Sequence, residues 1–272
     1  MKRRNMLQAF AGTAVAGALL RPDMQAIAQT SKDTLVFGQS TAVLTLDPAQ
    51  GAFTGYPAGY EAALCIYDRL MDFDAHMNIV PQLAESFTFA PDLLTATLKM
   101  RAGAKFHDGT PVDSAAAKVN LERLMDKARN PTNRPLWDPL ASVDTPDART
   151  VVIRLKTPFS QLRNSLAHGS GSLVSPAALK QFGETGIAKN PVGAGPYKLA
   201  SFTPGQELTL EAFDGYWGGK PPSRRLVFKS IGEAATRISA LRTAAVDVID
   251  TVPVTLVAQL KQDPAIEVIS AP

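Results

Sequence analysis

Several short runs of the chain alternate apolar and polar residues and are rich in Val, Ile, Thr and Phe, which predicts β-strands. In other segments apolar residues recur every three or four positions, as on one face of an α-helix. The predicted strands are Thr34–Ser40, Thr95–Arg101, Thr150–Lys156, Tyr197–Phe202, Glu207–Phe213, Leu226–Ile231, Val246–Asp250 and Ile266–Ser270. The predicted helices are Ala58–Met71, Asp113–Lys127, Phe159–Ala167, Pro176–Phe182, Glu233–Ala244 and Val254–Gln262. Because strands and helices interleave, the pattern favours an α/β fold.

The first residues have the features of an export signal. The basic sequence KRR precedes a short apolar run, Ala9–Leu20, and the sequence AIA fits a cleavage site that ends at Ala28. The apolar run is too short to span a bilayer. We therefore expect a cleaved signal peptide over residues 1–28, a periplasmic product and no direct membrane anchor. The arginine pair fits a twin-arginine signal and an ordinary secretory signal equally well.

The signal peptide also accounts for the net charge. The chain has 28 basic and 25 acidic residues, and residues 1–28 hold four of the basic and one of the acidic ones, so the remainder is neutral. A neutral body lacks the positive charge by which proteins bind nucleic acids or anionic membranes, and we predict neither partner. The one cysteine, Cys65, cannot form an internal disulfide.

The residues that usually carry chemistry are sparse. His76, His107 and His168 are scattered, and none has a second ligand at metal-binding spacing. The glycine pairs lack the spacing of a phosphate-binding loop, and no serine lies in a nucleophile elbow. We therefore predict no metal, no cofactor and no catalytic residue.

One motif, AKFHDGTP, places His107 beside Asp108 and Gly109. The aspartate, the glycine and the following proline predict a turn that leads into the helix at Asp113–Lys127. This interpretation makes the histidine structural. The alternative is a hydrolase that uses His107, Asp108 and a distant serine, and it requires a serine within hydrogen-bond reach of His107.

Three blocks of the sequence resemble the signature of family 5 solute-binding proteins of ABC importers, which bind oligopeptides, dipeptides, glutathione or nickel. The blocks are LAESFTFAPDLLTATLKMRAGAKFHDGTPVDSAAAKVNLERL, NPVGAGPYKLASFTPGQELTLEAFDGYWGGKPPSRRLVFKSI and ALRTAAVDVIDTVP. In that family the His-Asp-Gly turn is architectural. Two departures replace a usual glycine, by Leu93 and by Ala244. If Ala244 keeps a left-handed backbone, the alanine costs about 1–2 kcal/mol.

The resemblance implies an α/β lobe of the periplasmic binding protein type II kind with an inserted α/β subdomain. Mapped onto this chain, the main lobe uses residues 29–70 and 189–272, and the inserted subdomain uses residues 71–188. The family's second lobe would follow the end of this sequence, so the resemblance implies that this lobe is missing.

The implied function is capture of a small-molecule or peptide ligand, with peptides expected, for the membrane permease of an ABC importer. The complete protein is expected to be a monomer. An alternative is a periplasmic interaction module without a role in transport. The expected ligand wall comprises Ser40, Thr41, Leu44, Thr45, Phe53, Tyr56, Trp137, His168 and Ser170. Ordinary packing is the alternative role for the three aromatic residues, and an ordinary loop position is the alternative for the histidine.

Overall fold

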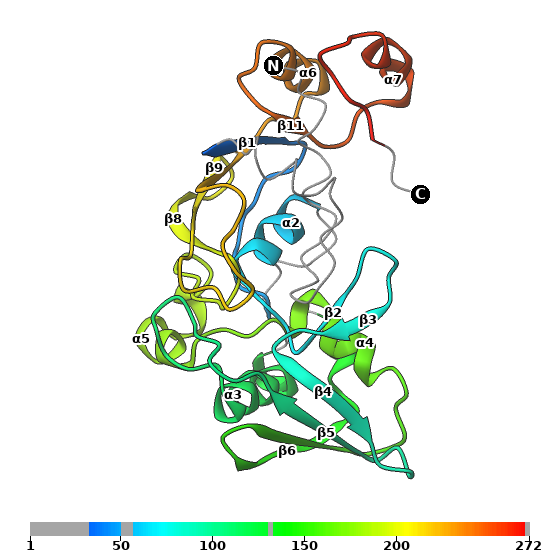
Figure 1. Cartoon of the computed structure of the whole chain (residues 1–272), viewed down its shortest axis with the longest axis vertical. Coiled ribbons are helices and arrows are strands. Elements are labelled where there is room, and N and C mark those ends of the chain that lie inside the picture. Colours follow the sequence, from blue (N-terminus) through cyan, green and yellow to red (C-terminus); the bar gives the residue numbers. More distant parts are fainter. Residues whose placement is uncertain (1–32, 50–56, 130–132, 270–272) are drawn as a thin grey trace.

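A computed structural model of the chain describes residues 33–49, 57–129 and 133–269, and the predicted signal peptide lies outside them. Figure 1 shows an elongated molecule with one sheet in its upper half and a second sheet at its lower end. Within the described residues, no helix has the length and apolar character needed to cross a membrane.

The upper sheet has five strands in the order β11-β1-β10-β9-β8. Its strands are β1 (Thr34–Gln39), β8 (Tyr197–Thr203), β9 (Glu207–Ala212), β10 (Arg225–Ser230) and β11 (Val248–Ile249). β1 pairs in parallel with β10 and β11, whereas β9 is antiparallel to both of its neighbours. The carboxyl ends of β1, β10 and β11 therefore meet at one edge of this sheet.

Two helices share a hydrophobic core with the upper sheet, α2 (Pro57–Ile66) and α5 (Pro176–Gly186). In this core the rings of Phe37 and Phe228, from neighbouring parallel strands, stack with their centroids 4.9 Å apart. Two further helices, α6 (Ala234–Arg242) and α7 (Val254–Lys261), follow β10 and β11. Figure 1 shows them together at the top of the molecule, beside the parallel strands.

The lower sheet has four antiparallel strands in the order β4-β5-β7-β6. Its strands are β4 (Ala84–Phe89), β5 (Thr95–Met100), β6 (Leu140–Asp147) and β7 (Thr150–Leu155). A hairpin of β2 (Met71–Phe73) and β3 (Ile79–Pro81) lies beside it. The remaining elements are α3 (Ser114–Met125), α4 (Leu162–Ala167) and the 3-10 turns η3 (Lys127–Arg129), η4 (Arg134–Leu136) and η5 (Gly169–Gly171).

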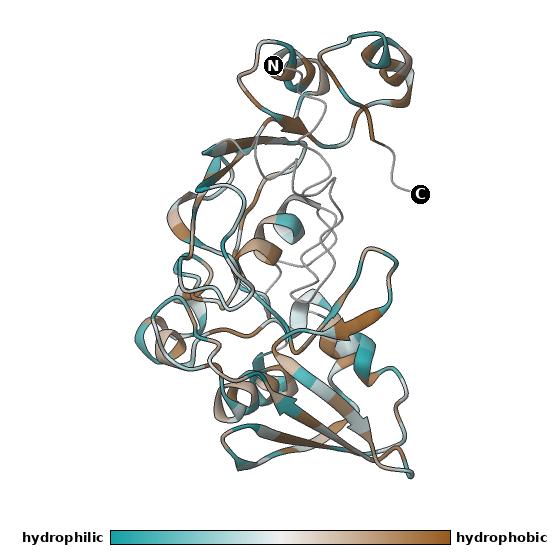
Figure 2. Cartoon of the chain, in the orientation of Figure 1, coloured by the Kyte–Doolittle hydropathy of each residue, from teal (hydrophilic) through white to brown (hydrophobic). Residues whose placement is uncertain are grey.

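A second hydrophobic core lies between the lower sheet and α3, and brown marks the hydrophobic residues of these strands in Figure 2. The helix α3 shows how the sequence builds this core. The Asp113 carboxylate accepts the backbone N–H of Ala116 at 2.9 Å and caps the helix. Leu121 and Leu124 then fall on one face and are buried in the core with Leu98 of β5. Asp113 therefore begins the helix predicted at Asp113–Lys127.

Seven of the predicted strands and all the predicted helices overlap an observed element. The strand predicted at Ile266–Ser270 is wrong for the described residues 266–269, which form no strand, because alternation makes a strand only where a neighbour supplies hydrogen bonds. The sequence missed β2, β3, β4 and β6. β6 contains Pro146 and lies at the sheet edge, where the missing N–H is tolerated, whereas β2 and β3 are too short to show a period.

Leu93 and Ala244, the two residues that replace family glycines, both have a left-handed backbone, with φ of 56° and 62°. Leu93 lies in the turn between β4 and β5. Ala244 follows α6, and its left-handed backbone ends that helix. Ala244 therefore has the left-handed backbone on which its expected energetic cost depends. We expect each side chain to cost about 1 kcal/mol relative to glycine.

The predicted division into a main lobe and a subdomain at residues 70/71 and 188/189 stays a prediction. The two hydrophobic cores can be compared with these boundaries. Leu70 and Leu173 belong to the lower core, although Leu70 falls within the range assigned to the main lobe. Val174, Ala178 and Ile187 belong to the upper core, although they fall within the range assigned to the subdomain.

Candidate ligand-binding site

Three chain segments follow the parallel strands of the upper sheet, and we call them together the carboxyl edge. They are residues 40–45 after β1, residues 231–233 after β10 and residues 250–253 after β11. In open α/β sheets, ligands bind outside the carboxyl ends of the strands. The carboxyl edge is therefore the candidate site.

Asp250 fastens the first of these segments to the last. Its carboxylate accepts the backbone N–H of Ser40 at 2.7 Å and the Ser40 hydroxyl at 2.9 Å. The same hydroxyl lies 3.2 Å from Oγ1 of Thr251. Ser40, a predicted ligand residue, therefore belongs to a polar clasp between the ends of β1 and β11.

A second carboxyl group lies close to this clasp. Glu61, on α2, accepts the side-chain amide of Gln39 at 3.1 Å. Loss of solvent around the Glu61 carboxyl raises its pKa, the amide of Gln39 opposes this shift, and the negative charge of Asp250 adds to it. Glu61 thus brings negative charge beside the clasp, whereas Arg237, 3.7 Å from Asp250, offsets the charge of that carboxylate. Negative charge at this place suits a ligand that carries an ammonium group.

The other predicted residues of this loop differ in their surroundings. The hydroxyl of Thr41 is buried and finds no hydrogen-bond partner among the described residues. Leu44 is 68% exposed, and the Thr45 hydroxyl accepts the N–H of Asp47 at 3.3 Å. Leu44 is therefore accessible to a ligand, whereas the Thr41 hydroxyl is enclosed and Thr45 is engaged within its own loop.

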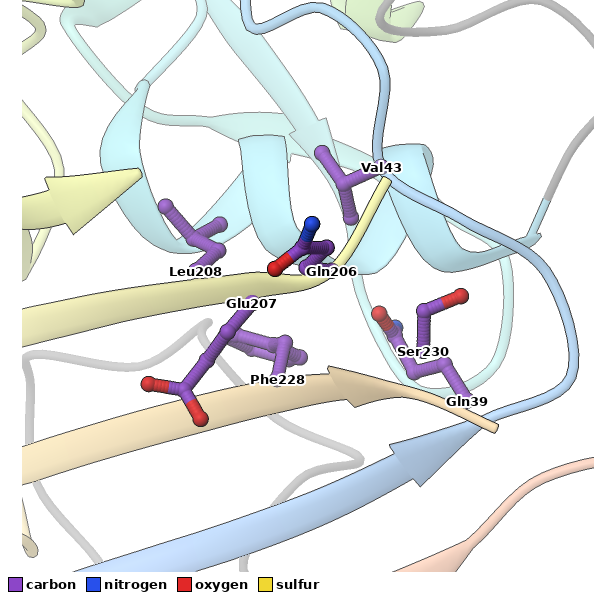
Figure 3. Close-up of a pocket in the computed structure, with 7 residues that line it drawn as sticks. All are labelled: Gln39, Val43, Gln206, Glu207, Leu208, Phe228 and Ser230. Atoms are coloured by element: carbon purple, nitrogen blue, oxygen red, sulfur yellow. The ribbon is translucent and has the colours of Figure 1, made fainter. Parts of the chain in front are cut away.

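A recess beside the loop is packing rather than a ligand pocket. Figure 3 shows its lining, in which Gln39 and Ser230 are neighbours at the ends of β1 and β10, and Val43 comes from the loop after β1. The recess has essentially no room for a water molecule. A ligand at the carboxyl edge would therefore bind on the outer surface of these segments.

The predicted residues Trp137, His168 and Ser170 lie in the other core region. Trp137 is fully buried and packs against Gly171, where an added Cβ would come within 2.9 Å of the indole ring. This burial agrees with the packing role that the sequence left open. Phe53 and Tyr56, the other two predicted aromatic residues, lie outside the described residues.

His168 and Ser170 form a small structural unit. The His168 Nδ1 atom accepts the N–H of Ser170 at 3.1 Å and lies 2.9 Å from its hydroxyl. Burial lowers the pKa of His168, and the positive charge of Arg69 lowers it further. His168 is therefore a neutral cap of the η5 turn. It lies beside the lower core, whereas the loop Ser40–Thr45 lies beside the upper core.

His107 connects its turn to the segment before β8. Its Nε2 atom donates to the carbonyl oxygen of Gly195 at 3.0 Å, and its Nδ1 atom accepts the N–H of Gly193 at 3.3 Å. Burial lowers the pKa of His107 to about 4; the Gly195 carbonyl and Asp108 oppose this shift, and Lys198 adds to it. Both ring nitrogens of this neutral histidine are therefore occupied by backbone.

Asp108 engages a serine, but that serine does not bond His107. The Ser175 hydroxyl donates to the Asp108 carboxylate, which also accepts the N–H of Thr110 at 3.0 Å. Ser175 in turn caps α5 by accepting the N–H of Ala178 at 3.3 Å. This arrangement joins a turn to a helix start, and it is not the serine–histidine contact that the hydrolase alternative requires.

A buried polar network that the sequence did not suggest lies where α2 meets the lower core. Gln82 donates to Asp68 at 3.0 Å and to Asp72 at 3.1 Å, and Trp217 donates to Asp68 at 2.6 Å. Arg69 pairs with Asp72. Burial raises the pKa of Asp68 to about 7; Trp217 and Arg69 oppose this shift, and Asp72 adds to it.

The residues at or beside the carboxyl edge that sequence reasoning missed are Glu61, Arg237 and Asp250. Asp250 bonds Ser40, 210 positions earlier. Glu61 bonds Gln39, 22 positions earlier, and Arg237 bonds carbonyl groups that are 5 to 14 positions away. The only local signal was that Asp250 ends the predicted strand Val246–Asp250, where a polar side chain reaches the carboxyl edge of a parallel strand.

Residues 78–272 match the family described as bacterial extracellular solute-binding proteins, family 5, middle part. The glutathione-binding protein GsiB of Escherichia coli strain K12 is 34% identical over 250 residues, which cover 92% of this chain and 48% of GsiB. GsiB of Pectobacterium atrosepticum is 35% identical over 215 residues, which cover 77% and 41%. The chain therefore spans about half the length of the curated relatives it matches.

Solved structures agree in fold. The binding protein AgaA from A. tumefaciens R10, in complex with agropinic acid, has a TM-score of 0.79 and 36% identity, covering 85% of this chain and 46% of AgaA. DppA from Helicobacter pylori, an ABC transporter-associated periplasmic binding protein in complex with the peptide STSA, has a TM-score of 0.76 and 27% identity, covering 85% and 49%. The chain belongs to the bacterial extracellular solute-binding proteins of family 5.

Proposed function

We propose that this chain belongs to the extracytoplasmic solute-binding component of an ABC importer and that it captures peptides at the carboxyl edge. The observation that carries the proposal is the clasp of Ser40, Asp250 and Thr251, which holds the ends of two parallel strands together where ligands of such sheets bind. Membership in the family supports the transport role.

The chemistry of the edge favours a ligand derived from amino acids. Glu61 supplies negative charge for an ammonium group, beside Asp250, whose charge Arg237 offsets. Ser40 and Thr251 place hydroxyl groups in the clasp. Leu44 adds exposed apolar surface. Peptides combine these three features, with an ammonium group, polar backbone groups and apolar side chains.

The rest of the expected ligand wall keeps its role as part of this proposal. Phe53 and Tyr56 would extend the wall from the loop after β1. His168 and Ser170 would contribute from beside the lower core, with Trp137 supporting them through Gly171. The protein would act in the periplasm after removal of residues 1–28, and it would deliver its ligand to a membrane permease.

Uptake by living cells tests the proposal, because it uses the gene as it occurs. Deleting the gene in its host bacterium should reduce uptake of radiolabelled trialanine to background, and a wild-type copy should restore it. A copy with Asp250→Ala should restore it only in part. Asp144→Ala is the matched control, since Asp144 forms an exposed ion pair with Arg154 on the lower sheet. Unchanged trialanine uptake in the deletion strain would overturn the proposal.

A second candidate ligand is an opine, a conjugate of an amino acid and a sugar. The specific observation is the 36% identity to AgaA, which was solved with agropinic acid. The same strains separate the candidates. Loss of agropinic acid uptake with normal trialanine uptake would favour the opine, and loss of both would indicate a broader site.

A further inference from the structure

We propose that Arg237 is a positioning residue that holds the carboxyl edge in the shape that binds ligand. The proposal rests on the function proposed above and adds to it a residue that does not contact the ligand. Arg237 lies on α6, is 3% exposed, and was not among the residues that the sequence pointed to.

The guanidinium of Arg237 joins two strand ends. One nitrogen, Nη1, donates to the carbonyl oxygens of Ile231 and Gly232 at 2.8 Å each, and Nη2 donates to the carbonyl oxygen of Thr251 at 2.9 Å. The first two carbonyls follow β10, and the third follows β11. A planar group with fixed donor directions therefore sets the spacing between these two segments.

The third strand end is joined through Asp250. Its carboxylate lies 3.7 Å from Nε of Arg237 and accepts both hydrogen bonds from Ser40 after β1. Arg237 and Asp250 therefore link all three segments of the carboxyl edge. The two side chains are buried or nearly so, with exposed fractions of 4% and 14%, so water screens their attraction weakly.

The backbone of Thr251 gives a reason for this linkage. Its φ is 45°, a left-handed value that is strongly disfavoured for a β-branched residue. Arg237 holds the Thr251 carbonyl, and Ser40 holds its hydroxyl. Strain of this kind persists only where the surroundings impose it, and it gathers at ligand sites. Without Arg237 we expect the turn to relax, so that ligand binding must order it again.

The test is the dependence of uptake rate on trialanine concentration, in the deletion strain carrying variants of the gene. Arg237→Gln should raise the KM of uptake about tenfold, because ordering one backbone residue costs about that factor in affinity. The maximal rate per molecule of periplasmic protein, measured by immunoblot, should stay the same. Arg237→Lys keeps the charge and should give an intermediate KM.

A stability control separates positioning from folding. Ala244→Gly relieves the left-handed backbone at the other end of β11, away from the carboxyl edge. Alone it should leave KM unchanged, and combined with Arg237→Gln it should raise the protein level without restoring KM. If Ala244→Gly restores KM, or if Arg237→Gln lowers only the protein level, the positioning role is overturned. If wild-type cells show no trialanine uptake, the proposed function is overturned first and the role of Arg237 with it.

Discussion

Acidification should destabilise this protein through His107, and the size of the effect follows from its surroundings. In an unfolded chain a histidine has a pKa of about 6.5. In the folded protein, burial lowers the pKa of His107 to about 4. The folded state therefore takes up this proton at a lower pH than the unfolded state, and its stability falls as the pH falls below 6.5.

The magnitude follows from the two pKa values. At pH 7.5 both states hold a neutral His107, and its contribution is complete. At pH 5 the unfolded state is protonated and the folded state is not, which costs the folded protein about 2 kcal/mol. The hydrogen bonds of the ring agree with a neutral folded state. The Nδ1 atom accepts from Gly193, and a protonated ring could not accept this bond.

The assay is urea unfolding of the mature protein followed by tryptophan fluorescence at pH 7.5, 6 and 5, for the wild type and for His107→Gln. The glutamine can still donate to Gly195 but does not titrate. We expect the variant to be less stable at pH 7.5 and to regain about 2 kcal/mol relative to the wild type by pH 5. Other titrating groups cancel in the difference. A constant difference across this range, or a His107 pKa near 6.5 by NMR titration, would falsify the argument.

Further predictions concern single substitutions, each measured by urea unfolding. Ala244→Gly and Leu93→Gly should each stabilise the protein by about 1 kcal/mol, because both positions have a left-handed backbone, and no gain would contradict the strain. Burial raises the pKa of Asp68 to about 7, so protonation of its carboxyl should stabilise the folded protein by about 1.4 kcal/mol as the pH falls from 8 to 6. This gain should be absent in Asp68→Asn, and an equal pH dependence of stability in both proteins would speak against it. Gly193→Ala should destabilise by about 3 kcal/mol or more, since the added Cβ would lie 2.1 Å from the Ile66 carbonyl oxygen. Gly232→Ala should not, since its Cβ would lie at an ordinary contact distance of 3.9 Å from the Ser40 carbonyl oxygen.

The sequence predicted the local elements well because their signals are local. The strand at Thr150–Leu155 and the helix α3 both show their periods within a few residues, and Asp113 marks the helix start. Elements without a local period were missed, such as β6 with its edge proline. The assignment of His107 to a structural turn also came from local signals, and its bonds to Gly193 and Gly195 agree with it.

The candidate site was predicted only in part, because its key contacts are long-range. The segment Ser40–Thr45 could be chosen from its place after a strand, but a local pattern says nothing about which distant strand lies beside it. The role of Trp137 stays a prediction, since an aromatic residue in a polar loop suits a ligand wall and a core equally well, and here its side chain is fully buried.

One buried arginine, Arg237, links segments of the carboxyl edge in a way that the local sequence does not indicate. Parallel strands are not connected to each other at their carboxyl ends. Backbone hydrogen bonds join only the first residues of the segments to β1, from Ile231 to Gln39 at 2.8 Å and from Asp250 to Gly38 at 3.4 Å. Beyond these residues the segments are linked by side chains, with Arg237 bridging two segments and Asp250 adding the third. Removing either side chain leaves every strand and helix with its own hydrogen bonds. We therefore expect substitutions at Arg237 and Asp250 to affect ligand capture more than folding, and substitutions at Asp113 or Gly193 to do the reverse.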